Sequence, residues 1–260
     1  MADATLGQVS VHPVKSFFVH MLTRDIELTD AVLDLLDNCV DGVQRTAPAK
    51  KLDRKKPYSG FWAKIVMNQN EFSIEDNCGG IAWELKDYAY RMGRLKQDID
   101  KGRHTIGTYG IGMKRAIFKI GHDCVVETHA KDASYKVHFS TDWMGDESQW
   151  DIDAESIEPA KERGTKVAVG TLRDSVSQQF GSDTFRESFE DTVRTHYAYI
   201  IGKGFKVFIN GQEVSPKHIR LLFVKQDDSP STTHPIEPFI YQTEHEGVDV
   251  FLAVGFTRGI

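Results

Sequence analysis

The chain has 260 residues, a hydrophobic content of 40% and a formal net charge of −6. This length and apolar content allow a full hydrophobic core, and the length exceeds that of most single domains, so one large domain plus part of another is expected. The acidic balance argues against a surface built as a whole for nucleic acid, because phosphate contacts need concentrated positive charge. Nucleic acid binding is therefore expected only through other regions.

The lack of recognisable targeting signals and the cysteine usage predict a cytoplasmic protein. The sequence has no run of 18 apolar residues, and its N-terminus lacks a basic segment followed by an apolar signal core, so no membrane association is expected. Three cysteines without a CxxC spacing predict reduced, partly buried thiols and neither a disulfide framework nor a zinc site; they are Cys39, Cys78 and Cys124.

One dense basic run interrupts the first third of the chain and lies between two prolines. A solvated loop is the favoured interpretation, and a local polyanion contact is the alternative. Its basic residues are Lys50, Lys51, Arg54, Lys55 and Lys56.

Apolar periodicity predicts the order of helices and strands. The first helix is predicted at 27–43, with Val32, Leu36, Cys39 and Val43 on one apolar stripe. Further helices are predicted at 83–92, 113–120 and 183–201. Strands are predicted at 61–67, 71–75, 124–128, 134–139, 166–171 and 206–209, the last closed by an Asn210-Gly211 hairpin turn. Residues 93–108 and 142–158 are predicted as loops, 229–238 as a connection and 239–256 as two more strands.

Three oxygen-bearing side chains on the first helix form the first candidate site. Asp34, Asn38 and Asp41 are spaced four and three apart, which places them on the face opposite the apolar stripe. Most amphipathic helices have such a polar face for solvent alone. An oxygen-rich face can also hold a hard cation such as Mg²⁺, which takes few protein ligands and keeps phosphate and water for the rest.

Two glycine-containing turns form the next candidates. The first turn follows a predicted strand and has the sequence Asp76-Asn77-Cys78-Gly79-Gly80. Its glycines allow close approach to a flat ligand, and its aspartate can accept a hydrogen bond from an exocyclic amine. An ordinary hairpin turn is the alternative. Gly107 to Gly112 precedes a helix, so its amides and the helix N-terminus form an anion site. This loop is not a Walker motif. A fourth segment, Arg163 to Val167, opens a strand and carries no signal by itself.

Taken in order, these four segments resemble the N, G1, G2 and G3 boxes of the GHKL ATPase superfamily of gyrase B, heat-shock chaperones, histidine kinases and MutL. The resemblance is closest to bacterial ATP-binding proteins and MORC-like members and spans residues 14–210. The resemblance is clearest in two segments, Asp34 to Gly42 (DLLDNCVDG) and Ile106 to Ala116 (IGTYGIGMKRA). It implies an α+β fold: a two-layer sandwich of the Bergerat type, in which helices cover one face of a mixed, mostly antiparallel sheet.

The resemblance also implies the roles of the site residues. Asn38 would coordinate Mg²⁺, Asp76 would bond the adenine amine with Thr165 supporting it through water, and Gly80 would admit the base. Residues 91–108 would form a lid over ATP. The nucleotide-binding set also includes Asp41 and the loop with the start of its helix: Gly107, Thr108, Tyr109, Gly110, Ile111, Gly112, Met113 and Lys114.

Two positions depart from the family pattern. The general base, usually a glutamate four residues before the asparagine, is here Asp34, so slow hydrolysis is expected. Cys78 replaces the first glycine of D-x-G-x-G, which is expected to put a side chain near the base pocket.

The domain organisation expected from the resemblance is an ATP-binding domain at 1–214, followed at 215–260 by a connection and the truncated beginning of a transducer-like region. Members of the superfamily commonly need a lysine from that next domain for turnover. The leading hypothesis is an ATPase whose ATP-bound state dimerises and switches attached domains or an effector. The alternatives are an ATP-sensing module without turnover, a histidine-phosphorylating kinase and a structural domain without nucleotide.

Overall fold

The computed structural model describes residues 11, 14–46, 55–93, 110–217, 220–223, 236–245 and 248–257. The chain divides into two compact units, residues 1–216 and residues 217–260. The first unit contains an eight-stranded sheet in the order β5-β4-β3-β6-β2-β1-β7-β8. Neighbouring strands are antiparallel, with the exception of β1 and β7 among the described pairs. The sheet is therefore mixed and mostly antiparallel, which confirms the predicted fold class.

Six strands of this sheet, all except β5 and β8, occupy positions close to those predicted from alternating hydrophobicity. The strands of the sheet are β1 (Trp62–Met67), β2 (Phe72–Asp76), β3 (Gly121–His129), β4 (Ser134–Phe139), β5 (Ala154–Ser156), β6 (Gly164–Leu172), β7 (Lys206–Ile209) and β8 (Gln212–Glu213). The predicted turn between β7 and β8 is confirmed, with positive φ angles of 48° at Asn210 and 83° at Gly211.

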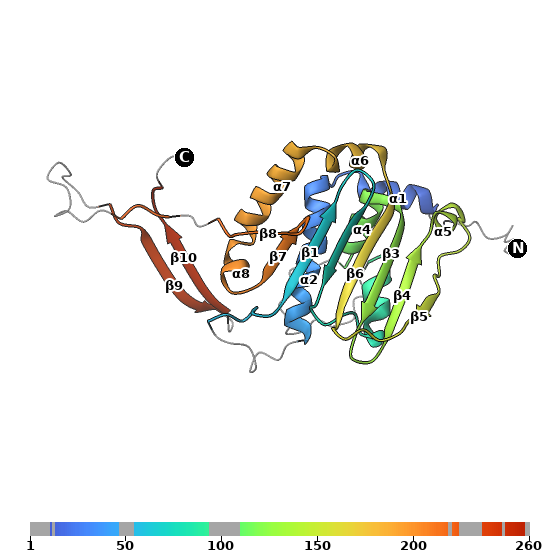
Figure 1. Cartoon of the computed structure of the whole chain (residues 1–260), viewed down its shortest axis with the longest axis horizontal. Coiled ribbons are helices and arrows are strands. Elements are labelled where there is room, and N and C mark those ends of the chain that lie inside the picture. The colour runs from blue at the N-terminus through green and yellow to red at the C-terminus, as the bar shows by residue number, and fades with distance from the viewer. Residues whose placement is uncertain are drawn as a thin grey trace, which may run out of the picture. The chain divides into compact units, whose positions relative to one another are not determined.

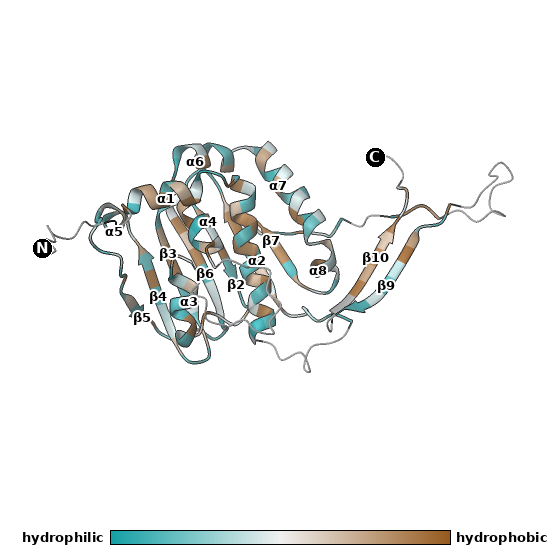
Figure 2. Ribbon diagram, turned by 180° about the vertical axis from the view of Figure 1, so that it is seen from behind, coloured by the Kyte–Doolittle hydropathy of each residue, from teal (hydrophilic) through white to brown (hydrophobic). Residues whose placement is uncertain are grey.

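Helices cover one face of the sheet, as Figure 2 shows from the side opposite to Figure 1. They are α1 (Lys15–Thr23), α2 (Leu28–Thr46), α3 (Lys86–Tyr90), α4 (Gly112–Ile120), α5 (Thr141–Gly145), α6 (Asp174–Phe180), α7 (Asp183–His196) and α8 (Ala198–Gly202). A 3₁₀ turn, Trp83–Leu85, precedes α3. No described helix is long and apolar enough to cross a membrane.

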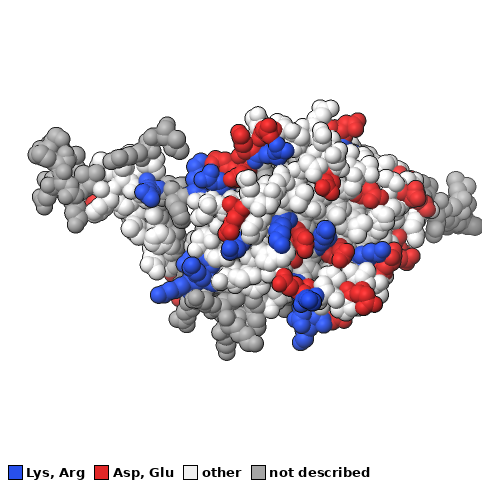
Figure 3. Space-filling view, viewed as in Figure 1, with Lys and Arg blue, Asp and Glu red and all other residues white. Residues whose placement is uncertain are grey.

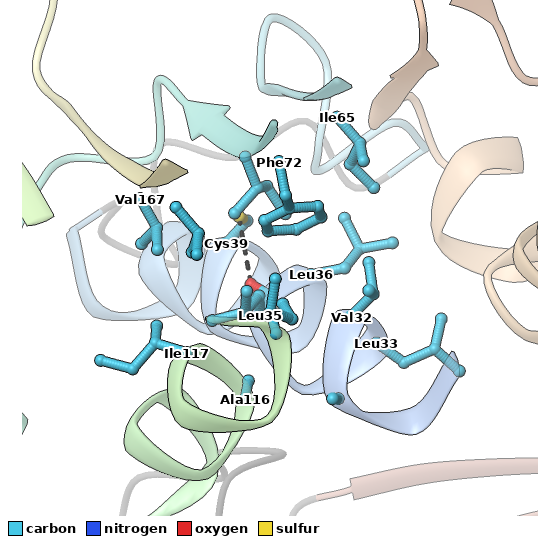
Figure 4. Packing of buried hydrophobic residues seen from close by; sticks show 14 of the residues in the cluster. Val32, Leu33, Leu35, Leu36, Cys39, Ile65, Phe72, Ala116, Ile117 and Val167 are labelled. Atoms are coloured by element: carbon cyan, nitrogen blue, oxygen red, sulfur yellow. Dashed lines mark hydrogen bonds between the residues drawn. The ribbon is translucent and has the colours of Figure 1, made fainter. Parts of the chain in front are cut away.

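The core lies between α2 and the sheet. The predicted stripe of Val32, Leu36, Cys39 and Val43 is buried, with exposed fractions of 4% or less. Figure 4 shows α2 side chains between sheet residues such as Phe72 and the residues Ala116 and Ile117 of α4. Leu33 and Leu35 are also buried, so α2 is enclosed on more than the side that carries the predicted stripe.

The opposite face of the sheet carries a row of cross-strand partners that alternate in charge. Each residue of the row is paired in register with the next, in the order Glu155, Lys136, Glu127, Lys166, Glu75 and Lys64. The row starts with an ion pair, in which Lys136 Nζ lies 2.9 Å from Glu155 Oε2. Figure 3 shows basic and acidic groups interspersed over this face. Opposite charges placed directly across strands favour this register over a shifted one.

Two predicted elements differ from the structure, and two further helices were not predicted. The helix predicted at 183–201 is two helices, α7 and α8, because the backbone at Tyr197 leaves helical geometry (φ −99°, ψ 11°). The loop predicted at 142–158 contains most of α5 and the strand β5, since Trp143 is buried and residues 154–156 pair with β4. The helices α1 and α6 were not predicted, because tertiary contacts hold these short segments.

In the second unit, the two strands predicted at 239–256 are confirmed. They are β9 (Phe239–His245) and β10 (Val248–Val254), which pair antiparallel. A bridge between Leu221 and Thr257 adds a further antiparallel contact. The assignment of this unit to a transducer-like region stays a prediction.

Candidate nucleotide pocket

One side of α2 lines a cavity of about 380 Å³. Four of the α2 residues that line it are spaced four, three and four apart and form one polar stripe along the helix: Asp34, Asn38, Asp41 and Arg45. At a rise of about 1.5 Å per residue, this stripe is roughly 16 Å long. Cavities of this size commonly hold small-molecule ligands. The three predicted side chains of the first helix therefore share one pocket with a basic residue at its end.

The first turn of α4 lies at the Asp34 end of the stripe. A Cβ atom added to Gly112 would lie 3.4 Å from the carboxylate of Asp34, and Gly110 has a positive φ of 66°. No side chain caps the N-terminus of α4, and its first turn contains no acidic residue. The unfilled N–H groups and the helix dipole make this end of the cavity suitable for an anion.

Lys114 belongs to this wall of the cavity, and its side chain is 2% exposed. Its ammonium group donates to the carbonyl oxygen of Ala89 at 2.6 Å and to that of Gly110. The lysine thus ties α3 to the loop before α4. The predicted nucleotide contact of Lys114 stays a prediction.

Asp76 lies at the other end of the cavity, where β2 ends. Its Oδ1 accepts a hydrogen bond of 2.7 Å from the N–H of Cys78. Burial raises the pKa of Asp76 to about 6, although hydrogen bonds from Cys78, from the Cys39 thiol and from the Thr165 backbone oppose this effect. At neutral pH the carboxylate is mostly ionised and acts as a partly desolvated acceptor.

Thr165 is brought next to Asp76 by the pairing of β6 with β2 and lines the same cavity. Its hydroxyl lies 3.3 Å from the hydroxyl of the buried Thr128, which also accepts a 2.7 Å hydrogen bond from the N–H of Ile81. The two threonines therefore fix the chain just after Gly80 against β3 and β6.

The glycines of this end allow backbone segments to approach closely. Gly80 has a φ of 74°, and a Cβ atom there would lie 2.4 Å from the carbonyl oxygen of His129. A Cβ atom on Gly164 would lie 1.8 Å from the carbonyl oxygen of Asp76. A side chain at either position would displace the backbone that carries Asp76.

Cys78 lies beside Asp76, near the base end as predicted, but it does not line the cavity. Its side chain is 1% exposed, is absent from the cavity lining and packs against α2, where a Cβ atom on Gly42 would lie 2.9 Å from that of Cys78. The turn directs Cys78 under the helix and leaves Gly80 at the cavity. All three cysteines are free and buried, more deeply than the partial burial predicted from the sequence.

Two carboxylates near the anion end differ in their surroundings. Burial raises the pKa of Asp34, opposed by the positive charge of Arg115 and reinforced by Asp30. Burial also raises the pKa of Asp37, opposed by a 2.5 Å hydrogen bond from the hydroxyl of Tyr197 to Asp37 Oδ1.

Of the predicted site residues, those in the described part of the chain all line the cavity: Asp34, Asn38, Asp41, Asp76, Gly80, Gly110, Ile111, Gly112, Met113, Lys114 and Thr165. Gly107, Thr108 and Tyr109, together with most of the predicted lid, lie outside the described residues. Sequence reasoning missed four polar lining residues, Asp37, Arg45, Tyr88 and Arg115. Helical spacing could have found three of them, because Asp37, Arg45 and Arg115 follow Asp34, Asp41 and Gly112 by three or four positions.

The polar groups that line the cavity decide whether a nucleotide and its metal ion fit there. The side-chain nitrogen of Asn38 is buried without a hydrogen-bond partner among the described residues, so it is an unused donor that suits an acceptor such as a phosphate oxygen, and its side-chain oxygen is the atom that suits a cation. No group of three or more His, Cys, Asp or Glu side chains that could hold a metal was found in the described part of the chain. A hard cation here would need further oxygen ligands from phosphate and water, and Mg²⁺ binds in this way. The residues present fit both ATP and Mg²⁺.

Comparison with known proteins agrees with the pocket geometry. The family model described as "Histidine kinase-, DNA gyrase B-, and HSP90-like ATPase" matches residues 26–171. This match covers more than half of the chain, and the chain belongs to this ATPase family. The predicted superfamily is thereby confirmed.

Two relatives show how much of a larger protein the chain spans. Human MORC family CW-type zinc finger protein 1 is 29% identical over 132 residues, which are 50% of this chain and 12% of that protein. The ATPase region of Saccharomyces cerevisiae topoisomerase II, solved with ICRF-187 (dexrazoxane), aligns with a TM-score of 0.49 and 15% identity over 72% of this chain and 48% of that one. The chain thus spans less than half of either protein.

Proposed function

We propose that this chain binds ATP with Mg²⁺ in the pocket between α2, α4 and the sheet, and that it hydrolyses the bound ATP slowly. The observation that carries the proposal is the polar stripe of α2, which runs from the first turn of α4 to the region of Asp76. A helix N-terminus suits the phosphates, and a desolvated carboxylate suits the amine of adenine. Membership in the ATPase family supports the same ligand.

At the base end, the carboxylate of Asp76 accepts a hydrogen bond from the exocyclic amine of adenine. Thr165 supports this contact through a water molecule, and Gly80 leaves room for the ring because it has no side chain. This assignment predicts that adenine nucleotides bind better than guanine nucleotides, whose base presents a carbonyl oxygen to Asp76.

At the phosphate end, the backbone amides of residues 110–112 and the first turn of α4 surround the phosphates, with Met113 and Lys114 beside them. Asn38 would hold Mg²⁺ through its side-chain oxygen, and Asp41 faces the nucleotide on the same stripe. The metal ion would supply charge neutralisation on the phosphate oxygens during transfer.

Asp34 is the proposed general base. A water oxygen attacks the γ-phosphorus, the bond from that phosphorus to the bridging oxygen breaks, and the proton of the water passes to Asp34, which leaves ADP and phosphate. Burial raises the pKa of Asp34 and makes it a stronger base, while its short side chain limits its reach. Slow turnover follows from the second effect.

Replacing Asp34 with alanine tests this role. We expect steady-state phosphate release to fall by about 100-fold or more, the usual contribution of a general base, with ATP affinity nearly unchanged. Asp191→Ala, at an exposed position of α7 outside the cavity lining, is the control and should retain turnover. Equal turnover in the wild type and the Asp34 variant would refute hydrolysis by Asp34 and favour the alternative of an ATP-sensing module, for which the shortened base is the motivating observation.

The nucleotide-bound state is proposed to form a homodimer and to act as a switch for attached domains or an effector protein. Gel filtration with and without a non-hydrolysable ATP analogue tests this part. A shift to the dimer volume with the analogue is expected, and a monomer under both conditions would contradict it.

A further inference from the structure

A pocket carboxylate outside the predicted site is held by a residue from a distant helix break. Asp37 lines the cavity next to Asn38, one turn after Asp34 on α2. The hydroxyl of Tyr197 lies 2.5 Å from Asp37 Oδ1 and 3.3 Å from the carbonyl oxygen of Leu33. Tyr197 lies 160 positions further along the chain, between α7 and α8, and its side chain is 4% exposed. The core therefore fixes the orientation of this carboxylate.

The two oxygens of Asp37 have different surroundings. Oδ1 accepts the hydrogen bond from Tyr197, whereas Oδ2 accepts no hydrogen bond from the described residues. Because a carboxylate has about four acceptor positions, Oδ2 retains its capacity for groups inside the pocket. The buried side-chain nitrogen of the adjacent Asn38 also lacks a partner among the described residues. Two consecutive polar residues of α2 that line the cavity thus have unused hydrogen-bonding capacity.

Three acidic side chains, Asp34, Asp37 and Asp41, lie within two turns of α2 and line the same cavity. A merely structural partner for the tyrosine could be a neutral amide, which avoids the cost of burying a carboxylate. A divalent cation with its water shell would offset the repulsion among the three acids.

We propose that Asp37 is an outer-sphere carboxylate of the Mg²⁺–ATP site, where it accepts hydrogen bonds from metal-bound water, and that Tyr197 is its positioning residue. This inference rests on the proposed function, because it concerns the same pocket and the same metal ion. Mg²⁺ usually keeps several waters when it binds through phosphates, so an oriented carboxylate beside Asn38 contributes to affinity without touching the metal.

The test is the Mg²⁺ dependence of ATP binding in Asp37→Asn and Tyr197→Phe. Binding of ATP is followed by calorimetry at a series of Mg²⁺ concentrations. The Mg²⁺ concentration for half-maximal binding should rise about 10- to 100-fold in Asp37→Asn, the usual effect of losing an outer-shell partner, and by a smaller factor in Tyr197→Phe. Tyr199→Phe, in which the altered side chain is 72% exposed, and the exposed Asp151→Asn are the matched controls and should leave the Mg²⁺ dependence unchanged.

Adenosine binding separates this role from a purely structural one. Adenosine carries no phosphate and recruits no metal ion, so its affinity should be the same in Asp37→Asn and in the wild type. An equal loss of adenosine and ATP affinity, or an unchanged Mg²⁺ dependence in Asp37→Asn, would overturn the inference. Wild-type protein that binds neither ATP nor adenosine would instead overturn the proposed function itself.

Discussion

Replacing Asp76 with asparagine separates the binding role of this residue from its effect on stability. Burial raises its pKa to about 6 from an ordinary value of 3.8. At neutral pH the folded protein therefore holds an ionised carboxylate at a cost of about 3 kcal/mol. Asparagine avoids this cost and keeps an acceptor oxygen for the N–H of Cys78. We expect the variant to be more stable at pH 7 by up to about 3 kcal/mol and to bind no ATP.

The pH dependence of this difference follows from proton linkage. Between pH 3.8 and about 6, Asp76 binds more protons in the folded protein than in the unfolded chain, so its contribution to the free energy of unfolding falls as the pH rises. Urea unfolding of both proteins at several pH values isolates this group, because other titrating groups cancel in the difference. The variant's advantage should be near zero around pH 4 and reach its full value around pH 7.

Two outcomes would refute this reasoning. An advantage that is independent of pH would mean that Asp76 does not titrate differently in the folded and unfolded chains. A variant less stable than the wild type at pH 7 would mean that hydrogen bonds to the carboxylate outweigh its desolvation.

Three further changes test the packing around the site. Gly164→Ala should lower stability by about 1–3 kcal/mol and weaken ATP binding, because the added Cβ meets the backbone of the Asp76 turn. Gly170→Ala, at a position of the same strand with open space around it, is the control. Equal effects of the two substitutions would contradict this cause. Lys166 lies opposite two cross-strand glutamates, so Lys166→Glu should lower the free energy of unfolding in urea by about 0.4–2 kcal/mol, and by less in high salt. A loss that does not depend on salt would argue against the charge row. Phe180→Ala, at a fully buried ring, should cost about 3–5 kcal/mol, and a loss near zero would place this ring outside the core.

Strong local patterns were sufficient to predict the elements that build the pocket. The apolar stripe of α2 predicts which side is core, so the positions of Asp34, Asn38 and Asp41 follow from helical geometry alone. The Asn210-Gly211 turn was predictable for a similar reason, because its positive φ angles suit these two residue types.

Elements that depend on distant contacts could not be predicted in this way. The N-terminal N–H groups of α1 at Lys15 and Ser16 donate to the carboxylate of Glu147, and Lys15 Nζ donates to three carbonyl groups of residues 143–149. The break at Tyr197 accompanies its hydrogen bond to Asp37. Nothing in the local sequence encodes these partners, which lie more than 100 positions away.

The position of Cys78 has a related cause. The order of residues in the turn places this cysteine beside Asp76, and only the positive φ angles of Gly79 (106°) and Gly80 (74°) show how the chain reverses after it. With Gly42 opposite, the thiol fits under α2, and the base end of the cavity is lined by Gly80.

Calorimetric titration of the wild-type protein and of Asp76→Asn with ATP in the presence of Mg²⁺ tests the central claim most directly. The pocket geometry predicts that ATP binds the wild-type protein at one site, that binding weakens when Mg²⁺ is removed, and that Asp76→Asn binds no ATP while it remains folded. Equal ATP binding by the two proteins, or none by a folded wild-type protein, would contradict the assignment of this cavity to the nucleotide.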